Sequence, residues 1–417
     1  MHTIVESEST PKADGFFMPG EYEEQERTWM LWPHRSDVWR NGAKPAQKVF
    51  AEIARTIARY QKITVGVNSE DYAAVNELLG EVENIQVLLM EYNDSWIRDP
   101  GPAFLVNDEG EVRLSHFHFN AYGGFYDGLY FPWDKDASLG MQLSQICQVK
   151  RYRPDDFVLE GGSFNCDGQG TVVTTEMCLL SPGRNPQYTK DQIEEKLKQY
   201  LGVEKVIWIK DGIDPYETNG HVDDVACFSA PGEVCCMWTD DPSHKFYQAC
   251  QAAYETLSTT TDARGRRLKI HKVIMPSTSV YMTAEEAESI DPVEGSLPRT
   301  PDDAFEPSYL NFLPINGAVL VPQFGDPNDA QALEDIRAAY PGREIIGIFE
   351  QADLLRRLSN SSLVIVSQVD QAGTETELKE ASDAIPQMIR SLMERGVKPR
   401  HIARLVTDLN RKLFRQV

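Results

Sequence analysis

The sequence predicts an α/β protein made of five similar units, each with two hairpin strands, a helix and a further strand, arranged around a common centre. Four segments share one order: an apolar run, a short turn rich in Gly, Asn, Asp or Pro, and a second apolar run. They recur at intervals of about 60 to 85 residues, which is typical of internal repeats. Amphipathic helical patterns lie between them, so the class is α/β rather than all-β.

The four hairpins are expected at residues 103–112, 164–173, 226–234 and 311–321. The first helix is expected at 43–60, followed by a strand at 63–67. Thr189 is a predicted N-cap for a second helix, with Ile193, Leu197 and Leu201 on one stripe and a strand at 205–209 after it. A third helix is expected over residues 328–340.

Composition limits the classes of partner. The 417 residues are 41% hydrophobic, which is enough for a substantial core, and the net charge of -23 argues against nucleic acid or an anionic membrane surface. No apolar run is long enough to span a membrane, and the N-terminus lacks the pattern of a signal peptide. Seven cysteines show neither disulfide nor zinc spacing. We therefore expect a cytoplasmic protein without a bound metal.

Three polar motifs come shortly before three of the predicted hairpins. They carry Asp99, Glu160, and the pair His221 and Asp223. If His221 and Asp223 lie on a strand, both side chains point to one face, where an imidazole and a carboxylate can serve proton transfer and cation binding. Each motif also has a structural alternative: Asp99 as a turn former, Glu160 as a surface residue of a glycine turn, and His221 as a packed turn residue.

In repeated units around a centre, the three motifs would converge. Carboxylates brought together in this way repel one another unless a cation joins them. A metal ion is one candidate, although only one histidine is available. A planar guanidinium is the other, since Asp99, Glu160 and Asp223 could contact its edge in bidentate fashion.

The sequence resembles the agmatine deiminase family, of the pentein or guanidine-modifying superfamily, which also contains bacterial peptidylarginine deiminases. The resemblance runs from about residue 15 to about residue 348 in the family's order and spacing. It is carried by FMPGEYE (17–23), TWMLWP (28–33), DSWIRDPGP (94–102), FNAYGG (119–124), YFPWD (130–134), FVLEGGS (157–163), RNP (184–186), TNGHVD (218–223) and PQFGDP (322–327).

The resemblance implies a five-bladed α/β-propeller that hydrolyses agmatine to N-carbamoylputrescine and ammonia, a step of putrescine and polyamine biosynthesis, with no metal or organic cofactor. It implies that Asp99 and Asp223 hold the guanidinium and that His221 is the general acid/base. Glu160 would help orient the site, and Trp96 would line the channel for the alkyl chain. A homodimer is common in the family.

Asp94 is a further candidate for substrate binding. Helix or turn capping and an ion pair with Arg98 explain this carboxylate equally well.

The family's nucleophile is missing. Members end with a Gly-Gly-Gly-Asn-Ile-His-Cys stretch whose cysteine attacks the guanidinium carbon and forms a covalent intermediate that water resolves. That cysteine is expected near Leu363, but no cysteine follows Cys250. Cys166 is a poor substitute, because a neighbouring carboxylate raises a thiol pKa. Loss of a hydrolase nucleophile can cost about 10⁶ in kcat, by analogy with a protease triad.

The C-terminal segment has a different character. Residues 375–395 and 399–414 show two amphipathic helical patterns, and the last 70 or so residues resemble the end of a CBS domain running into the helical region of nucleotidyltransferase-type signalling proteins. We therefore expect a flexible N-terminus at 1–14, a deiminase domain at 15–348 whose last unit is incomplete, and a helical tail at 349–417.

Three interpretations remain open, and whether the chain is an enzyme is undecided among them. The chain is an agmatine deiminase, a catalytically inactive guanidine-binding relative or chimera with a helical interaction tail, or a peptidylarginine deiminase. All three share a cationic guanidine as the ligand.

Overall fold

The computed structural model describes residues 2–294, 296 and 299–349. This part of the chain is a mixed α/β fold with four three-stranded sheets, one four-stranded sheet and one two-stranded sheet. The strands by sheet are β2 (Arg27–Leu31), β3 (Lys62–Val67) and β4 (Ile85–Leu89); β1 (Thr3–Val5), β7 (Arg151–Arg153), β6 (Val112–Ser115) and β5 (Ala103–Val106); β8 (Phe164–Cys166), β9 (Thr171–Thr175) and β10 (Lys205–Ile209); β11 (Ala226–Ala230), β12 (Glu233–Trp238) and β13 (Lys269–Ile274); β16 (Leu313–Ile315), β17 (Ala318–Pro322) and β18 (Glu344–Ile348); and β14 (Val280–Tyr281) with β15 (Ala304–Phe305).

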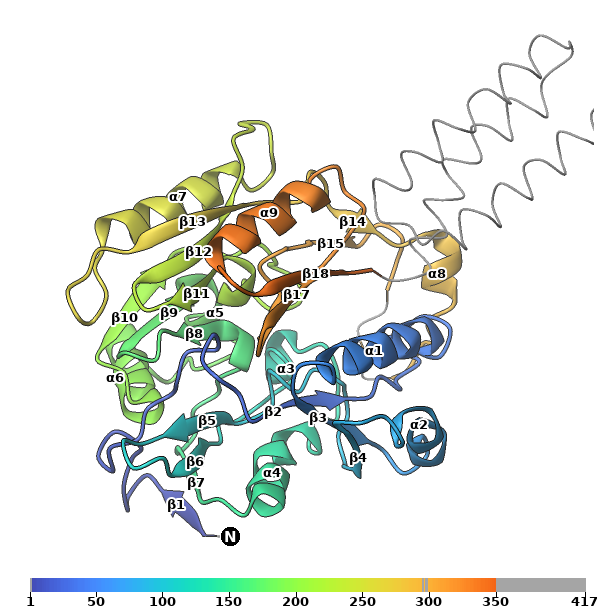
Figure 1. Ribbon diagram of the computed structural model, residues 1–417, viewed down its shortest axis with the longest axis horizontal. Helices are drawn as coiled ribbons and strands as arrows, with labels where there is room; N and C mark the ends of the chain where they lie inside the picture. The colour runs from blue at the N-terminus through green and yellow to red at the C-terminus, as the bar shows by residue number, and fades with distance from the viewer. Residues whose placement is uncertain (1, 295, 297–298, 350–417) are drawn as a thin grey trace, which may run out of the picture.

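Helices connect these strands, and Figure 1 shows several of them, such as α2, α6 and α7, toward the outside of the molecule. They are α1 (Lys44–Ile57), α2 (Tyr72–Leu79), α3 (Gly124–Asp127), α4 (Leu139–Cys147), α5 (Glu176–Leu179), α6 (Lys190–Leu201), α7 (Tyr247–Thr259), α8 (Ala284–Glu288) and α9 (Asp329–Ala339), with 3₁₀ turns η1 (Asp136–Ser138), η2 (Gly161–Ser163) and η3 (Val222–Asp224). None of the helices in the described part is long and apolar enough to cross a membrane.

The four predicted hairpins are confirmed. β5 pairs antiparallel with β6, β8 with β9, β11 with β12 and β16 with β17. In each case a helix follows and leads to a third strand, β7, β10, β13 or β18, that pairs parallel with the second hairpin strand. The last of these four units contains both hairpin strands, α9 and β18, and the expectation that the domain's last unit is incomplete stays a prediction.

The sheet of β2, β3 and β4 differs from this pattern. β2, β3 and β4 pair in parallel throughout, because helices rather than tight turns connect them. The segment 1–14, expected to be flexible, contains β1, which pairs with β7 through its backbone. The proposed domain boundaries stay predictions. The expected C-terminal helices, the tail at 349–417 beyond Phe349, and the position near Leu363 lie outside the described residues.

Helix α6 shows how the local sequence builds one of these units. Thr189 caps it as predicted: its hydroxyl accepts from the Gln192 amide, and the Gln192 side chain accepts from the Thr189 amide. Ile193, Leu197 and Leu201 are fully buried and pack with the core beside β9. Each such side chain contributes about 1.5–3 kcal/mol on burial, so this stripe fixes α6 against its sheet.

Candidate active site

The three motifs lie in the segments that lead into three equivalent hairpins. Asp99 precedes β5, Glu160 immediately precedes η2 and β8, and His221 starts η3, which leads into β11. Two of these segments touch directly, since η2 packs on η3. The structure therefore brings the predicted site residues together, as the repeat interpretation requires.

The local conformation at His221 differs from the prediction. His221 and Asp223 do not lie on a strand, because residues 222–224 form the 3₁₀ turn η3 and the strand begins only at Ala226. Asn219 and Gly220 before it adopt positive φ values of 56° and 77°, which form the sharp turn into η3. The two side chains converge through this turn and not through strand alternation.

Gly162 lies at the centre of the site. A side chain at this position would meet Asp223 Oδ2 at 2.8 Å and Asp99 Oδ1 at 3.0 Å, and it would also collide with His221 Nδ1. His221 Nδ1 lies 3.8 Å from Asp99 Oδ1. The two aspartates and the imidazole thus face one small space that only a glycine leaves open.

Two hydrogen bonds hold the Asp99 carboxylate. The Gly162 amide donates to Oδ1 at 2.8 Å, and the Tyr122 hydroxyl donates to Oδ2 at 2.8 Å. Burial nevertheless raises the pKa of Asp99, against the lowering effect of these hydrogen bonds and of Arg98 and Arg184. Asp99 thus lies in a turn, as the alternative interpretation had it, but its carboxylate is held by Gly162 and Tyr122 from outside that turn.

Arg98 supplies a cation to the second aspartate. Its Nε lies 3.1 Å from Asp223 Oδ2, and its Nη1 pairs with Glu21. Burial raises the pKa of Asp223 well above its ordinary value even beside this guanidinium, and Asp224 and Asp99 raise it further. The other carboxylate oxygen, Asp223 Oδ1, is buried without a hydrogen-bond partner.

The proposed ion pair between Asp94 and Arg98 is wrong. Arg98 pairs with Glu21 and Asp223, whereas Asp94 Oδ1 accepts from the Ser95 amide at 2.7 Å, which is the capping alternative. Asp94 is buried, and burial raises its pKa.

Glu160 is fully buried and paired with an arginine. Arg184 Nε donates to Glu160 Oε1 at 2.8 Å, and neither side chain is exposed. Arg184 also donates to the Thr218 carbonyl at 3.0 Å and to the side chain of Asn219. It therefore ties Glu160 to the turn that carries His221. Glu160 is not the surface residue of the alternative interpretation.

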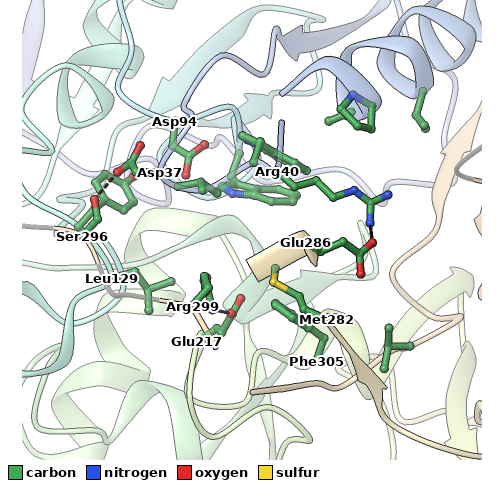
Figure 2. A pocket seen from close by; sticks show the side chains of 18 of the residues that line it. Asp37, Arg40, Asp94, Leu129, Glu217, Met282, Glu286, Ser296, Arg299 and Phe305 are labelled. Carbon is green, nitrogen blue, oxygen red and sulfur yellow. Dashed lines mark hydrogen bonds and ion pairs between the residues drawn. The ribbon is translucent and has the colours of Figure 1, made fainter. Parts of the chain in front are cut away.

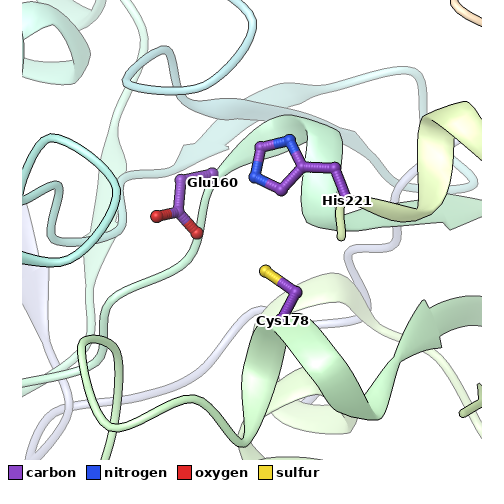
Figure 3. A group of neighbouring side chains, drawn as sticks. All are labelled: Glu160, Cys178 and His221. Carbon is purple, nitrogen blue, oxygen red and sulfur yellow. The ribbon is translucent and has the colours of Figure 1, made fainter. Parts of the chain in front are cut away.

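A thiol that was not among the predicted site residues lies beside this pair. Figure 3 shows Cys178, on α5, facing Glu160 and His221. One ligand atom from each of the three residues lies within 4.8 Å of the others. Burial lowers the pKa of His221 to about 3, so its imidazole is neutral near pH 7.

Cys166, the substitute thiol considered from the sequence, is buried on β8. Burial raises its pKa most, followed by the charges of Asp167 and Glu21 and not by that of Glu160.

A cavity of about 450 Å³ borders the site (Figure 2). Trp96, Asp94 and Tyr122 belong to its wall. Trp96 is 44% exposed and stacks on Trp39, with ring centroids 5.2 Å apart. Acidic groups are prominent in the lining, where Glu217 pairs with Arg299 and Glu286 with Arg40. Trp96, expected to line a channel, thus lies in the wall of this cavity together with Trp39, and its role toward an alkyl chain stays a prediction.

Tyr122, Arg184 and Cys178 are site residues whose position the sequence did not reveal. Tyr122 and Arg184 lie within the recognised motifs FNAYGG and RNP, so those motifs were the available signal. Cys178 carried no spacing signal, because its neighbours in space come from segments far away in the chain.

Fold and site together define a protein of the guanidine-modifying class. Residues 17–359 match the family of Porphyromonas-type peptidyl-arginine deiminases, and the chain belongs to this family. Agmatine deiminase of Pseudomonas aeruginosa is 46% identical over 338 residues, with 81% of this chain and 91% of that protein covered.

Solved structures agree with the sequence comparison. Agmatine deiminase of Enterococcus faecalis is 52% identical and superposes with a TM-score of 0.79, covering 82% of this chain and 93% of that one. The structure of a cysteine-to-serine variant of C. jejuni agmatine deiminase with substrate bound is 25% identical, with a TM-score of 0.67, covering 82% of this chain and 92% of that one.

Proposed function

We propose that this chain recognises agmatine in the manner of an agmatine deiminase, and that it hydrolyses agmatine slowly or not at all. The observation that carries the proposal is the placement of Asp99 and Asp223 around the space left by Gly162. Two relatives that are 46% and 52% identical to this chain are named agmatine deiminases, which supports agmatine as the guanidine ligand.

The charges at the site favour a cation. The carboxylates of Glu21, Asp99, Glu160 and Asp223 outnumber the guanidinium groups of Arg98 and Arg184. A bound guanidinium adds positive charge, and its planar N–H groups can donate to two carboxylates at once. Asp223 Oδ1, buried without a partner, is one acceptor that such a ligand would satisfy.

The bordering cavity would take the rest of the ligand. Agmatine carries an ammonium group at the end of a short alkyl chain. Trp96 and Trp39 provide an apolar wall for that chain, and the acidic side chains Asp94 and Glu217 line the same cavity. Aromatic faces and carboxylates are both favourable neighbours for an ammonium group.

Hydrolysis requires a nucleophile beside this guanidinium. A neutral His221 can accept a proton and pass it to departing ammonia, with Glu160 beside it. Among the described cysteines, Cys178 is near His221 but is buried, and burial and then Glu160 raise its pKa. The thiol is therefore protonated and a weak nucleophile. Substrate binding to the cysteine-to-serine relative supports recognition without turnover.

Peptidylarginine deimination is the second candidate, because the matching family is described by that activity. A peptide ligand would need room for a backbone at the mouth of the cavity, whereas agmatine ends in an ammonium group. The two ligands are therefore compared directly in the experiment.

The experiment measures the thermal midpoint of the full chain with agmatine or a blocked arginine peptide, together with ammonia release. We expect agmatine to raise the midpoint more than the peptide, since ligand binding to the folded state stabilises it. Asp223→Asn should abolish most of the increase. Asp108→Asn, in the exposed turn after β5, is the matched control and should keep it.

Ammonia release at a rate typical of the relatives would contradict the proposed slow turnover. A missing thermal shift would contradict agmatine recognition. A variant with cysteine restored near the predicted position, Leu363→Cys, tests the nucleophile directly and should release more ammonia than the unmodified chain.

Further expectations belong to the same proposal. We infer a five-bladed arrangement of the sheets, a homodimer, a cytoplasmic location, and a C-terminal tail related to nucleotidyltransferase-type signalling proteins. The family membership and the mixed α/β fold support the first of these.

A further inference from the structure

Asp136, on the 3₁₀ turn η1, is a fully buried carboxylate that contacts the cavity wall from within the protein. Its two oxygens accept hydrogen bonds from three donors. The Asn93 amide donates to Oδ1 at 2.6 Å, the Asp94 amide reaches both oxygens at 3.2 Å, and the Tyr130 hydroxyl donates to Oδ2 at 2.5 Å. One carboxylate therefore joins the segment at 93–94 to Tyr130.

The contact between η1 and the segment at 93–94 is reciprocal. The side-chain oxygen of Asn93 accepts from the Lys135 amide at 2.9 Å and from the Asp136 amide at 3.1 Å. Each segment thus binds the backbone of the other. A network in which every member has its partner fixes both segments in one relative position.

The joined segments carry the groups that face the ligand in the proposed function. Asp94, Trp96 and Tyr130 belong to the cavity wall, and Figure 2 shows Asp94 among the side chains that line it. Asp99 follows in the same tight segment, where its amide donates to the Trp96 carbonyl at 3.0 Å. The position of the backbone at 93–94 therefore sets the position of Trp96 and Asp99.

We propose that Asp136 is a positioning residue for the guanidine site, and that its ionised carboxylate holds the segment 93–99 and Tyr130 in the arrangement that binds the ligand. This inference rests on the proposed function for the identity of the ligand. An ionised carboxylate only accepts, and hydrogen bonds to a charged acceptor are the stronger ones. A protonated carboxyl group carries a hydrogen on one oxygen, which then faces the three donors as a competing donor.

The change between the two forms falls near neutral pH. Burial raises the pKa of Asp136 to about 7, and the charge of Asp94 raises it as well, against the lowering effect of the hydrogen bonds from Tyr130 and Asn93. The proton on Asp136 is therefore exchanged in a pH range where the chain can be studied folded.

The titratable and charged groups around this carboxylate are few. Asp94 and Tyr130 contact it directly, and the guanidinium of Arg35 lies 4.4 Å from the centre of the Tyr130 ring. The side chain of Lys135 is exposed. His116 bonds to the carbonyl of η1 residue 137, and its pKa of about 3 keeps it neutral near pH 7.

Ligand affinity should therefore depend on pH through Asp136. When only the ionised form binds, the apparent affinity falls with the ionised fraction, which drops about 10-fold between about pH 8 and about pH 6. Asp99 and Asp223 also have raised pKa values and add their own pH dependence. The test therefore compares variants and not a single profile.

The first test is calorimetric titration of the full chain with agmatine at about pH 8 and about pH 6. Asp136→Asn keeps the size of the side chain and removes its charge, so it should bind agmatine at the higher pH about 10-fold more weakly than the unmodified chain. It should also lose most of the change in affinity between the two pH values. Asp134→Asn is the matched control, because Asp134 is exposed and lies two residues earlier, and it should keep both properties.

Tyr130→Phe tests the same role with a smaller change. It removes the hydroxyl that donates to Asp136 and leaves the ring in place. Loss of this donor raises the pKa of Asp136 further, so the midpoint of the affinity profile should move to higher pH. A general loss of structure would instead weaken binding equally at both pH values and leave their ratio unchanged.

The second test needs no ligand. Hydrogen exchange of the segment 93–99, followed by mass spectrometry at about pH 8, reports the protection of the amides that donate to Asp136. Exchange there should be faster in Asp136→Asn than in the unmodified chain or in Asp134→Asn. Equal exchange in all three would overturn the positioning role.

The outcomes separate the two proposals. Agmatine that binds the unmodified chain, with the same ratio of affinities between the two pH values in Asp136→Asn and Tyr130→Phe, would overturn the role of Asp136 and leave the proposed function intact. Absence of agmatine binding to the unmodified chain would contradict the proposed function, and the exchange measurement then decides the positioning role alone.

Discussion

At the scale of single residues, the contact between Arg184 and Glu160 joins two of the segments that form the site. Both side chains are buried completely, and Arg184 also contacts the turn before His221. Removing one member of such a pair leaves an uncompensated buried charge. Arg184 is therefore a positioning residue that connects two of the motifs.

We predict that Arg184→Leu lowers the free energy of unfolding by about 3–5 kcal/mol. Urea unfolding followed by circular dichroism measures this change. The double variant Glu160→Gln with Arg184→Leu should recover part of the loss, because the unpaired charge is gone. A single variant as stable as the unmodified chain would show that the pair is not needed for stability.

The raised pKa values of Asp99 and Asp223 predict a pH dependence of agmatine recognition. When folding raises the pKa of a carboxylate, its protonated form stabilises the unliganded fold at any pH below the ordinary pKa of 3.8. This stabilisation is lost as the pH rises through the raised pKa of the folded state. The guanidinium requires the ionised forms. The agmatine-induced increase in thermal midpoint should therefore grow as the pH rises above 3.8 and disappear on acidification.

This dependence is measured by thermal unfolding with and without agmatine across a pH series. Asp223→Asn removes one of the titrating groups and should flatten the profile. An agmatine effect that is constant with pH in the unmodified chain would contradict a binding site built from these carboxylates.

At the scale of elements, the capping of α6 is a local interaction that can be tested alone. Thr189→Ala removes the hydroxyl that accepts from Gln192 and should cost about 1 kcal/mol of stability. Thr56→Ala is the matched control, because Thr56 lies inside α1 and does not cap it. This variant should change the stability little. Chemical unfolding of both variants measures the difference, and equal losses would contradict the capping role.

The hairpins and helices could be predicted because each depends on a local pattern. The strands at 205–209 and the helix start at Thr189 were confirmed, since turn residues and apolar periodicity are properties of short segments. The sheet of β2, β3 and β4 was not predicted as fully parallel, because strand partners far apart in the chain are set by packing.

The same distinction holds for the site. Asp99, Glu160 and His221 stood out by their motifs, and their convergence followed from the repeated hairpins. The contacts of Arg98 with Asp223 and of Arg184 with Glu160 depend on tertiary structure, as does the position of Cys178. The 3₁₀ turn at His221 was missed because its Gly-His-x-Asp sequence is compatible with both a strand and a turn.

At the scale of the whole molecule, the proposed function separates recognition of the guanidine from its hydrolysis. Asp99, Asp223, His221 and Trp96, to which the proposed function assigns guanidine recognition, all lie in the described part of the chain and within the family's matched region. The position of the family's nucleophile instead falls in a segment with no cysteine. Binding should therefore survive in a chain that turns over little substrate.

The most direct test of this account is calorimetric titration of the full chain with agmatine, with ammonia measured in the same solution. The account predicts saturable binding at one site per chain, loss of that binding in Asp223→Asn, and no more than trace ammonia. Absence of binding heat, or ammonia release at the rate of an active deiminase, would contradict it.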